Sequence, residues 1–333
     1  MMEKVDPSEG FDERTVADFY KSRTVTIYVG STPGGGYAVY AGVLARHLPR
    51  HLPGAPAIRI EFMGEKAGFR LTGALANSMP RDGTMIGAIR SANTVESVLN
   101  PSDEVDFDVR DFNWIGSVSR QNGTLITWHA SDIKTVADAR RRTVVAGAES
   151  PFSNVGTLPN ILNGLLGTRF VTNSSFDRKG LERAFETGEV EAICGLGYNT
   201  LLAAHSDWLA GGKINILAHT GLERDPLMPG VPCTIEFAAT EDDRNVIRMM
   251  DYRQVMGRPY AAPPGVPADR LAALRRAFMA TMKDPAFLAD ARKNNMLVDP
   301  LNAGQMADIV AEAHRMPAHI ISRTWDLLGG IVD

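Results

Sequence analysis

The chain has 333 residues, of which 44% are hydrophobic and 22% are charged, a composition typical of folded globular proteins. Its length exceeds what one hydrophobic core usually supports, so two lobes are expected. The net charge of −4 argues against nucleic acid as a main partner. No run of about 18 apolar residues is present, so no membrane insertion is expected.

The first residues are polar and lack the apolar segment of a signal peptide. This leaves two interpretations, a cytoplasmic protein or an exported protein whose leader is absent from this sequence. Cys194 and Cys233 are the two cysteines. They form no C-x-x-C pair, so neither a disulfide framework nor a zinc ribbon is predicted.

A glycine-rich stretch, Gly-Ser-Thr-Pro-Gly-Gly-Gly-Tyr, occupies residues 30–37. The preceding residues 24–29 are rich in β-branched and aromatic side chains, which predicts a strand. Residues 37–48 show helical spacing of apolar side chains until Pro49. A strand-to-helix turn of this kind leaves backbone N–H groups free at the positive end of a helix dipole, so an anion site is expected.

The known nucleotide motifs do not fit this turn. A Walker loop would need Lys and Ser or Thr where Gly36 and Tyr37 stand, and a dinucleotide fingerprint would need glycine at Val39. The simpler alternative is a tight turn without a ligand. Three consecutive glycines exceed what one turn requires, which favours contact between the backbone and a ligand.

The following residues predict a βαβ pattern and therefore a parallel sheet. Strands are expected at 57–63 and 84–89, with a loop at 64–68 and a helix at 69–78 between them. The loop after the last strand, residues 90–93, contains Ser91 and Asn93. Because ligands bind at the carboxyl ends of parallel strands, the turns at 30–37, 64–68 and 90–93 are expected to share one edge.

A second βαβ series is predicted in the middle of the chain. Strand-like runs at 112–118 and 123–128 are expected to carry the chain from one lobe to the next. The series itself consists of strands at 143–147, 170–172, 192–196 and 214–218, helices at 158–166 and 178–187, and a polar loop at 148–157.

The last third contains a proline-rich return segment at 257–267, followed by helices. Asp269 is expected to cap the first helix and Asp284 to precede the second. A helical stretch from 303 to 328 is expected to break at Pro317. These helices have no neighbouring strands, so they are expected to pack on the first lobe.

Enzyme signatures are scarce. There is no G-x-S-x-G elbow and no H-E-x-x-H motif. His47 and His51 have the spacing of a helical metal pair, but Pro49 lies between them and no third ligand is evident. We therefore expect no catalytic residue, no metal and no cofactor. The polar loops instead contain Ser, Thr, Asn and Gly, residue types suited to binding.

Five segments, in this order, resemble the Bug family, the periplasmic solute receptors of tripartite tricarboxylate transporters. The resemblance covers most of the chain from about Phe19. The segments are Gly30-Ser31-Thr32-Pro33-Gly34-Gly35-Gly36-Tyr37, Pro80-Arg81-Asp82-Gly83-Thr84, Asp111-Phe112, Glu186-Thr187-Gly188-Glu189-Val190-Glu191-Ala192 and Arg258-Pro259-Tyr260-Ala261-Ala262-Pro263-Pro264-Gly265-Val266-Pro267.

The resemblance implies an α/β periplasmic-binding-protein-like fold with two lobes, each a mainly parallel sheet flanked by helices, and with crossing strands as the hinge. Lobe I is expected at 1–122 and 256–333, and lobe II at 123–255. The family holds a small carboxylate in the interlobe cleft, partly through waters. The two binding loops of the family, carried onto this chain, give as contacts Ser31, Thr32, Gly35, Gly36, Tyr37, Ser153, Asn154, Gly156 and Thr157. We also expect contacts from Ser91 and Asn93 at the predicted sheet edge and from Tyr198 in the cleft.

One loop departs from the family pattern. Where the family usually has a Pro-Gly-Ala-Gly-Gly type of loop, this chain has Gly64-Glu65-Lys66-Ala67-Gly68. The charged pair puts the backbone contacts of that loop in question. Arg70 and Arg90 lie near the predicted edge, and each is either a partner for a second carboxylate or a solvated surface residue.

The predicted function is that of a monomeric periplasmic receptor, without enzymatic activity, that delivers a small organic carboxylate to the membrane subunits of a tripartite transporter. The sequence leaves open a di- or tricarboxylate or an aromatic acid. Two alternatives remain, an enzyme acting on a small organic acid and a signalling adaptor that presents its ligand state to a membrane sensor.

Overall fold

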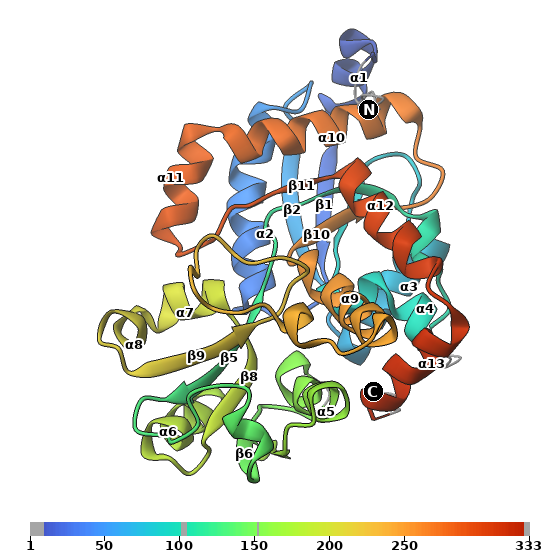
Figure 1. The fold of residues 1–333 in the computed structure, drawn as a ribbon. Helices are drawn as coiled ribbons and strands as arrows, with labels where there is room; N and C mark the ends of the chain where they lie inside the picture. Colours follow the sequence, from blue (N-terminus) through green and yellow to red (C-terminus); the bar gives the residue numbers. More distant parts are fainter. Residues whose placement is uncertain (1–9, 101–104, 152, 330–333) are drawn as a thin grey trace. The chain divides into compact units, whose positions relative to one another are not determined.

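The computed structural model describes residues 10–100, 105–151 and 153–329 of the chain. These residues form two compact units, each built from two separate stretches of chain (Figure 1). Lobe I comprises the described parts of 1–120 and 256–315, and lobe II those of 121–255 and 316–333. Each lobe contains one β-sheet flanked by helices, so the predicted α/β fold is confirmed.

The sheet of lobe I has six strands in the order β11-β4-β10-β3-β1-β2. β1 is parallel to both β2 and β3, as the βαβ pattern predicted. β10 is antiparallel to β3 and to β4, and β11 is antiparallel to β4, so the sheet is mixed. The strands are β1 (Thr24–Val29), β2 (Ala57–Phe62), β3 (Met85–Ala88), β4 (Asn113–Ser117), β10 (Pro259–Ala262) and β11 (Leu301–Asn302).

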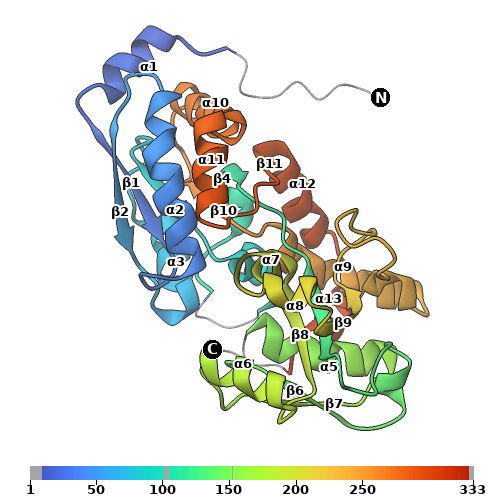
Figure 2. The same ribbon diagram turned by 90° about the vertical axis from the view of Figure 1, so that its left-hand side faces the viewer.

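One face of this sheet is covered by four helices. Val25, Ile27 and Val29 alternate along β1 toward this face, as expected for the two-residue period of a strand. Tyr40 and Leu44 come from α2, which lies along β1 and β2 (Figure 2). The four helices are α1 (Glu13–Tyr20), α2 (Gly36–His47), α10 (Ala268–Lys283) and α11 (Pro285–Lys293).

The opposite face carries α3 (Phe69–Asn77). Ile86 and Ala88 of β3 belong to the core just described, so Gly87 between them faces the other side. A Cβ atom at Gly87 would lie 3.0 Å from Leu75 of α3. The glycine therefore lets α3 approach the strand closely, which fixes where the loop before α3 meets the edge of the sheet.

Lobe II has a five-stranded sheet in the order β7-β6-β8-β5-β9. β6 is parallel to β7 and β8, whereas β5 is antiparallel to β8 and β9. The sheet is therefore mixed as well. The expectation of a mainly parallel sheet in each lobe is thus corrected, because parallel pairing is confined to β1, β2 and β3 in lobe I and to β6, β7 and β8 in lobe II. Its strands are β5 (Gly123–Trp128), β6 (Val144–Gly147), β7 (Phe170–Asn173), β8 (Ala192–Gly197) and β9 (Ile214–His219).

Helices cover both faces of this second sheet. α6 (Arg178–Thr187), α7 (Tyr198–Ala204) and α8 (Ser206–Ala210) enclose a core that includes Phe185 and Trp208. α5 (Asn154–Leu166) and α9 (Glu241–Val255) line a separate small cavity with buried leucine and methionine side chains. The predicted strands and α6 are confirmed in type, and their ends agree to within about two residues.

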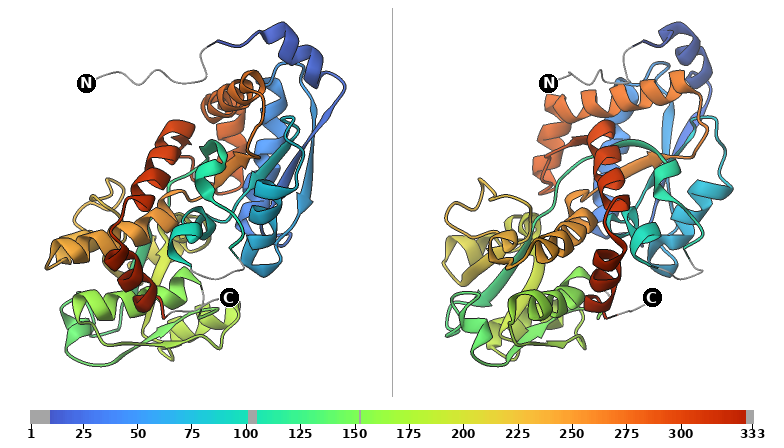
Figure 3. Two further views of the ribbon diagram at one scale, coloured as in Figure 1. Left: turned by 90° about the vertical axis from the view of Figure 1, so that its right-hand side faces the viewer. Right: turned by 45° about the vertical axis from the view of Figure 1, so that its right-hand side comes forward.

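The last helix corrects the expected division of the chain. We expected all of 256–333 in lobe I, but α13 (Ala318–Leu327) belongs to lobe II. It packs on α9 and α5 (Figure 3), and Arg323 forms an ion pair of 2.5 Å with Asp243 of α9. Pro317 separates it from α12 (Ala303–His314), which stays in lobe I, so the predicted break is confirmed.

One local expectation needs revision, and two elements were not predicted. Pro267 stands at the N-cap of α10, so Asp269 lies inside the first turn of the helix and is not its cap. The helix α1, which buries Val16 and Tyr20, was not predicted. The short strand β11 was not predicted either, because two residues carry no periodicity.

A buried carboxyl group lies in lobe II, on α9. Asp251 is 4% exposed, and within the described part of the chain its Oδ2 atom has no hydrogen-bond partner. Burial raises the pKa of Asp251 from 3.8 to about 8, against a smaller lowering by a backbone hydrogen bond from Gly221. The folded protein therefore keeps a proton on this group at pH values where an unfolded chain has released it.

We predict that this proton makes the stability of lobe II fall as the pH rises. The contribution of this proton to the free energy of unfolding is complete below the unfolded pKa of 3.8 and is lost by about pH 8. Between these values the free energy of unfolding falls with a slope approaching about 1.4 kcal/mol per pH unit. Urea unfolding from pH 5 to 8 checks this. The midpoint of the wild type is expected to drop more steeply than that of Asp251→Asn, and parallel curves would contradict the prediction.

Candidate ligand-binding site

The glycine-rich turn of lobe I joins β1 directly to α2. The N–H of Gly30 donates to the carbonyl of Ala88 at 3.0 Å, which ties the turn to β3. Gly34 has a φ of +84°, a conformation that favours glycine. Gly35 is the N-cap of α2 and offers no side chain, so no side-chain hydrogen bond caps the helix. The first N–H groups of α2 thus lack the acceptor that Ser, Thr, Asn or Asp would supply.

The three predicted turns do meet at one edge of the sheet of lobe I. A Cβ atom at Gly64 would lie 2.6 to 2.9 Å from the backbone of Ser31, so the second turn rests directly on the first. A Cβ atom at Gly68 would lie 3.0 Å from the carbonyl oxygen of Gly30 and 2.9 Å from the Arg90 side chain. This part of the sequence-based expectation is confirmed.

Tyr37 links the first turn to the third. Its hydroxyl accepts a hydrogen bond of 2.8 Å from the N–H of Ser91 and lies 3.2 Å from the Ser91 hydroxyl. Asn93 behaves differently, since it is 2% exposed and donates to the hydroxyl of Thr72 at 3.2 Å. Of the two residues predicted in this turn, Ser91 lies beside the glycine-rich turn and Asn93 is part of the interior.

A cation lies against the start of α2. Arg258 precedes β10, and a Cβ atom at Gly36 would lie only 3.1 Å from its Nη2 atom. Its guanidinium carbon lies 4.5 Å from the ring centroid of Tyr37 and 4.8 Å from that of Tyr40. The same group donates to the carbonyl of Gly257 at 2.6 Å. Stacking on two aromatic faces and this bond hold the charge beside the first turn of the helix.

The sequence did not identify Arg258 as a site residue. It stands more than 200 positions after the glycine-rich turn, in a segment interpreted as a return connection and as part of the family resemblance, with no ligand contact assigned to it. β10 pairs with β3, and β3 pairs with β1, so the sheet brings the start of β10 to the edge where β1 ends. An arginine directly before a strand that returns to the first lobe was the available signal.

The two arginines left open by the sequence have different surroundings. Arg70 forms an ion pair of 2.9 Å with Glu65, and both side chains are more than half exposed. Such a surface pair contributes little energy, and it joins Glu65 of the unusual loop at 64–68 to Arg70 in the first turn of α3. Arg90 packs its aliphatic stem against Gly68. Lys66, the other charged residue of the loop, has a left-handed φ of +49°.

In lobe II the predicted polar loop is partly helical. We expected the helix to begin at Leu158, but α5 begins at Asn154, with Ser153 as its N-cap. The hydroxyl of Ser153 accepts from the N–H of Gly156 at 3.1 Å and donates to the carbonyl of Ser150 at 2.8 Å. A Cβ atom at Gly156 would lie 2.1 Å from that same carbonyl oxygen, so glycine is required there for packing.

The remaining residues predicted in lobe II take distinct positions. Thr157 is 4% exposed, and its hydroxyl donates to the carbonyl of Ser153 at 3.1 Å. Asn154 is half-buried in the first turn of α5. Tyr198 begins α7, and its hydroxyl donates to the carbonyl of Leu227 at 3.2 Å. Ser153, Gly156 and Thr157 therefore build the start of α5, and Asn154 stands in its first turn.

His47 and His51, which have the spacing of a metal pair, contact different carboxylates in the structure. His47 lies 2.9 Å from Asp290 and His51 lies 3.0 Å from Asp284, so each ring has its own carboxylate. Among the described residues, no group of three His, Cys, Asp or Glu side chains is arranged to hold a metal ion. In the same part of the chain, no helix is long and apolar enough to span a membrane.

Comparison with solved structures places this fold among two-lobed periplasmic binding proteins. No protein-family model matches the chain, and no curated protein matches its sequence. A TctC solute-binding protein from Polaromonas is 16% identical, with a TM-score of 0.68 over 94% of this chain and 100% of that one. MatC from Rhodopseudomonas palustris with bound malate is 20% identical, with a TM-score of 0.61 over 92% and 99%.

A third solved structure has the same fold. The R. palustris protein Rpa4515 with adipate is 18% identical, with a TM-score of 0.61 over 92% of this chain and 98% of that one. At such low identity these likenesses are evidence for the fold. They agree with the two-lobed architecture that the sequence predicted.

We predict that Tyr37→Phe destabilises lobe I, because the N–H of Ser91 loses its acceptor. An unsatisfied buried donor costs about 1–3 kcal/mol, and denaturant unfolding measures the loss. Tyr198→Phe in lobe II is the matched control, since its hydroxyl bond is exposed and its removal is expected to cost less. Equal effects of the two variants would contradict the role given to Tyr37.

Proposed function

We propose that this protein is a solute receptor of the Bug family, which binds a small organic carboxylate outside the cytoplasm for a tripartite transporter. The fold supports this assignment, since the MatC and Rpa4515 structures contain malate and adipate. The membrane subunits of the transporter are the proposed partners. In this proposal the protein binds and releases its ligand without chemical change.

The observation that carries the proposal is the start of α2. Its first N–H groups have no side-chain cap, and the guanidinium of Arg258 lies beside them. A carboxylate there would accept hydrogen bonds from the backbone and face both the helix dipole and a full positive charge. Each hydrogen bond to a charged group contributes about 1.5–3 kcal/mol, and micromolar affinity requires about 8 kcal/mol.

The glycine residues make the backbone accessible to such an anion. Gly35 and Gly36 are exposed, and neither presents a Cβ atom to a ligand approaching the helix start. Ser31 and Thr32 add hydroxyl groups within the same turn. We propose that Ser153 and Asn154 of lobe II contribute the remaining polar contacts and that the two lobes close on the ligand by hinge bending.

We predict that Gly35→Val abolishes carboxylate binding and leaves the fold intact. Gly35 has φ −81° and ψ 172°, which valine adopts readily, and its nearest neighbour would be the Thr32 carbonyl at 3.8 Å. The added side chain would therefore occupy the space in front of the helix start. Gly34, with its positive φ, would be strained by any side chain and is not suited to this test.

Thermal-shift and calorimetric titration with mono-, di- and tricarboxylates measure this effect. A ligand that binds only the folded state raises its melting temperature. Gly42→Val, in the same helix but away from its start, is the control and is expected to retain binding. If no carboxylate stabilises the wild type, the proposed function is wrong. If Gly35→Val binds a carboxylate normally, the assignment of the binding site to the glycine-rich turn is wrong.

We predict that Arg258→Gln weakens carboxylate affinity about 10- to 100-fold, the equivalent of one charge-assisted hydrogen bond. Arg258→Lys keeps the charge but loses the planar group that stacks on Tyr37 and Tyr40, so an intermediate affinity is expected. Titration of both variants with the ligand found for the wild type measures the effect. Affinity unchanged in Arg258→Gln would remove Arg258 from the site.

A further inference from the structure

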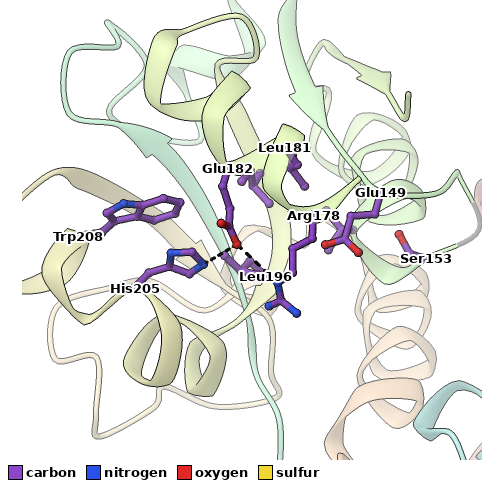
Figure 4. Close-up of a pocket in the computed structure, with 10 residues that line it drawn as sticks. Glu149, Ser153, Arg178, Leu181, Glu182, Leu196, His205 and Trp208 are labelled. Carbon is purple, nitrogen blue, oxygen red and sulfur yellow. Dashed lines mark ion pairs between the residues drawn. The ribbon is translucent and has the colours of Figure 1, made fainter. Parts of the chain in front are cut away.

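Lobe II contains a cavity of about 130 Å³ on the α6–α8 side of its sheet (Figure 4). Its walls come from the loop and helix after β6, from α6, from β8 and from α8 with the residue before it. Most of the lining is apolar, and it includes Val155, Leu181, Ile193, Leu196 and Trp208. Of these lining residues, the proposed function uses Ser153 and leaves the apolar part of the cavity without a role.

One wall of the cavity consists of aromatic rings. His205 and Trp208 are stacked, with centroids 4.0 Å apart and an angle of 21° between their planes. Trp128 meets Trp208 edge to face at 5.6 Å, and the indole N–H of Trp208 donates to Glu186 at 3.1 Å. The wall is therefore held from behind by fixed contacts. A planar guest would find a preformed surface, which lowers the entropic cost of binding.

The charged groups around the cavity disfavour the binding of a carboxylate inside it. Glu182 lies 3.5 Å from Arg178 and 3.4 Å from His205, so the one arginine of the lining is already paired (Figure 4). Burial lowers the pKa of His205, so its ring gains a proton less readily than an exposed histidine does. Glu149 adds a further negative charge to the lining. An anionic guest would face two carboxylates with one shared cation.

The volume corresponds to a single ring. An engineered apolar cavity of about 150 Å³ binds benzene, and this cavity is close to that size. We propose that it is a binding site for one uncharged aromatic ring. The ring would stack within the space bounded by Trp208, Leu181 and Leu196.

The position of the cavity connects this site to the proposed receptor function. Ser153, the N-cap of α5, lies on its border together with Val155. A ring in the cavity would therefore carry its substituent toward the polar start of α5. This gives the proposal a second step, which rests on the proposed function. The ligand of the receptor is an aromatic monocarboxylate, and a di- or tricarboxylate is disfavoured.

The test uses the full chain and benzyl alcohol, a neutral ring without a carboxylate. Binding is followed by tryptophan fluorescence, for which Trp208 is the local reporter, and by thermal shift. Leu196→Phe is expected to fill the cavity and weaken binding at least tenfold. Leu202→Phe is the matched control, because Leu202 lies on α7, is 43% exposed and does not line the cavity.

Saturable binding that Leu196→Phe removes and Leu202→Phe retains would support the site. No binding to the wild type, or equal binding by both variants, would overturn it. If Leu196→Phe fails to fold, a crystal of the wild type soaked in 4-bromobenzyl alcohol decides the question by the position of the bromine. Bromine inside the cavity supports the proposal, and bromine only elsewhere overturns it.

A second experiment distinguishes a failure of the ring site from a failure of the receptor function. The wild type and Gly35→Val are titrated with 3-phenylpropionate, adipate and benzyl alcohol. Tighter binding of 3-phenylpropionate than of adipate, lost in Gly35→Val while benzyl alcohol still binds, supports both steps. Binding of benzyl alcohol without any carboxylate refutes the receptor function alone. Binding of adipate without benzyl alcohol refutes the ring site alone.

Discussion

Close contact between backbone segments at one edge of lobe I is the constraint on which its site depends. Gly64 rests on the backbone of Ser31, and Gly68 rests on the carbonyl of Gly30. A side chain at either position would push the second turn away from the first. With glycine there, the turn before α2 is supported from below, and its outer side stays open. Rigid support for an exposed backbone is what an anion-binding turn requires.

The N-termini of α2 in lobe I and α5 in lobe II are capped differently. In lobe I, α2 has glycine at its N-cap and an arginine beside its first turn. In lobe II, Ser153 caps α5 with its own hydroxyl, and the nearby carboxylates offset the cations. Uncapped N–H groups beside a cation are therefore found at the start of α2, whereas the start of α5 is closed by its own side chain. Under the proposed function and the proposed ring site, this difference would give recognition of charge to lobe I and recognition of shape to lobe II.

Local patterns were enough to predict much of this arrangement, and distant contacts account for what they missed. β1 and α2 follow from β-branched and helical spacing on either side of the glycines. The start of α5 was placed late because its first turn, capped by Ser153, consists of polar and small residues that were interpreted as a loop. The role of Arg258 depends on the pairing of β10 with β3, and the lobe of α13 depends on Arg323 reaching Asp243. Both contacts join residues far apart in the chain, so local spacing does not reveal them.

The interleaved order of the chain has a consequence for folding. Lobe I lacks β10 and α10 until residues 256–315 have been added, and lobe II lacks α13 until still later. During synthesis from the N-terminus, the core of lobe I that includes Tyr260 and Phe278 is incomplete while the first 255 residues are being made. In lobe II, the core around Phe185 and Trp208 lies within residues 126–216, so it is the packing of α13 on α9 and α5 that comes last. Contacts over such long sequence separations form slowly. A chain that ends at Arg315 would leave lobe II without this part of its packing.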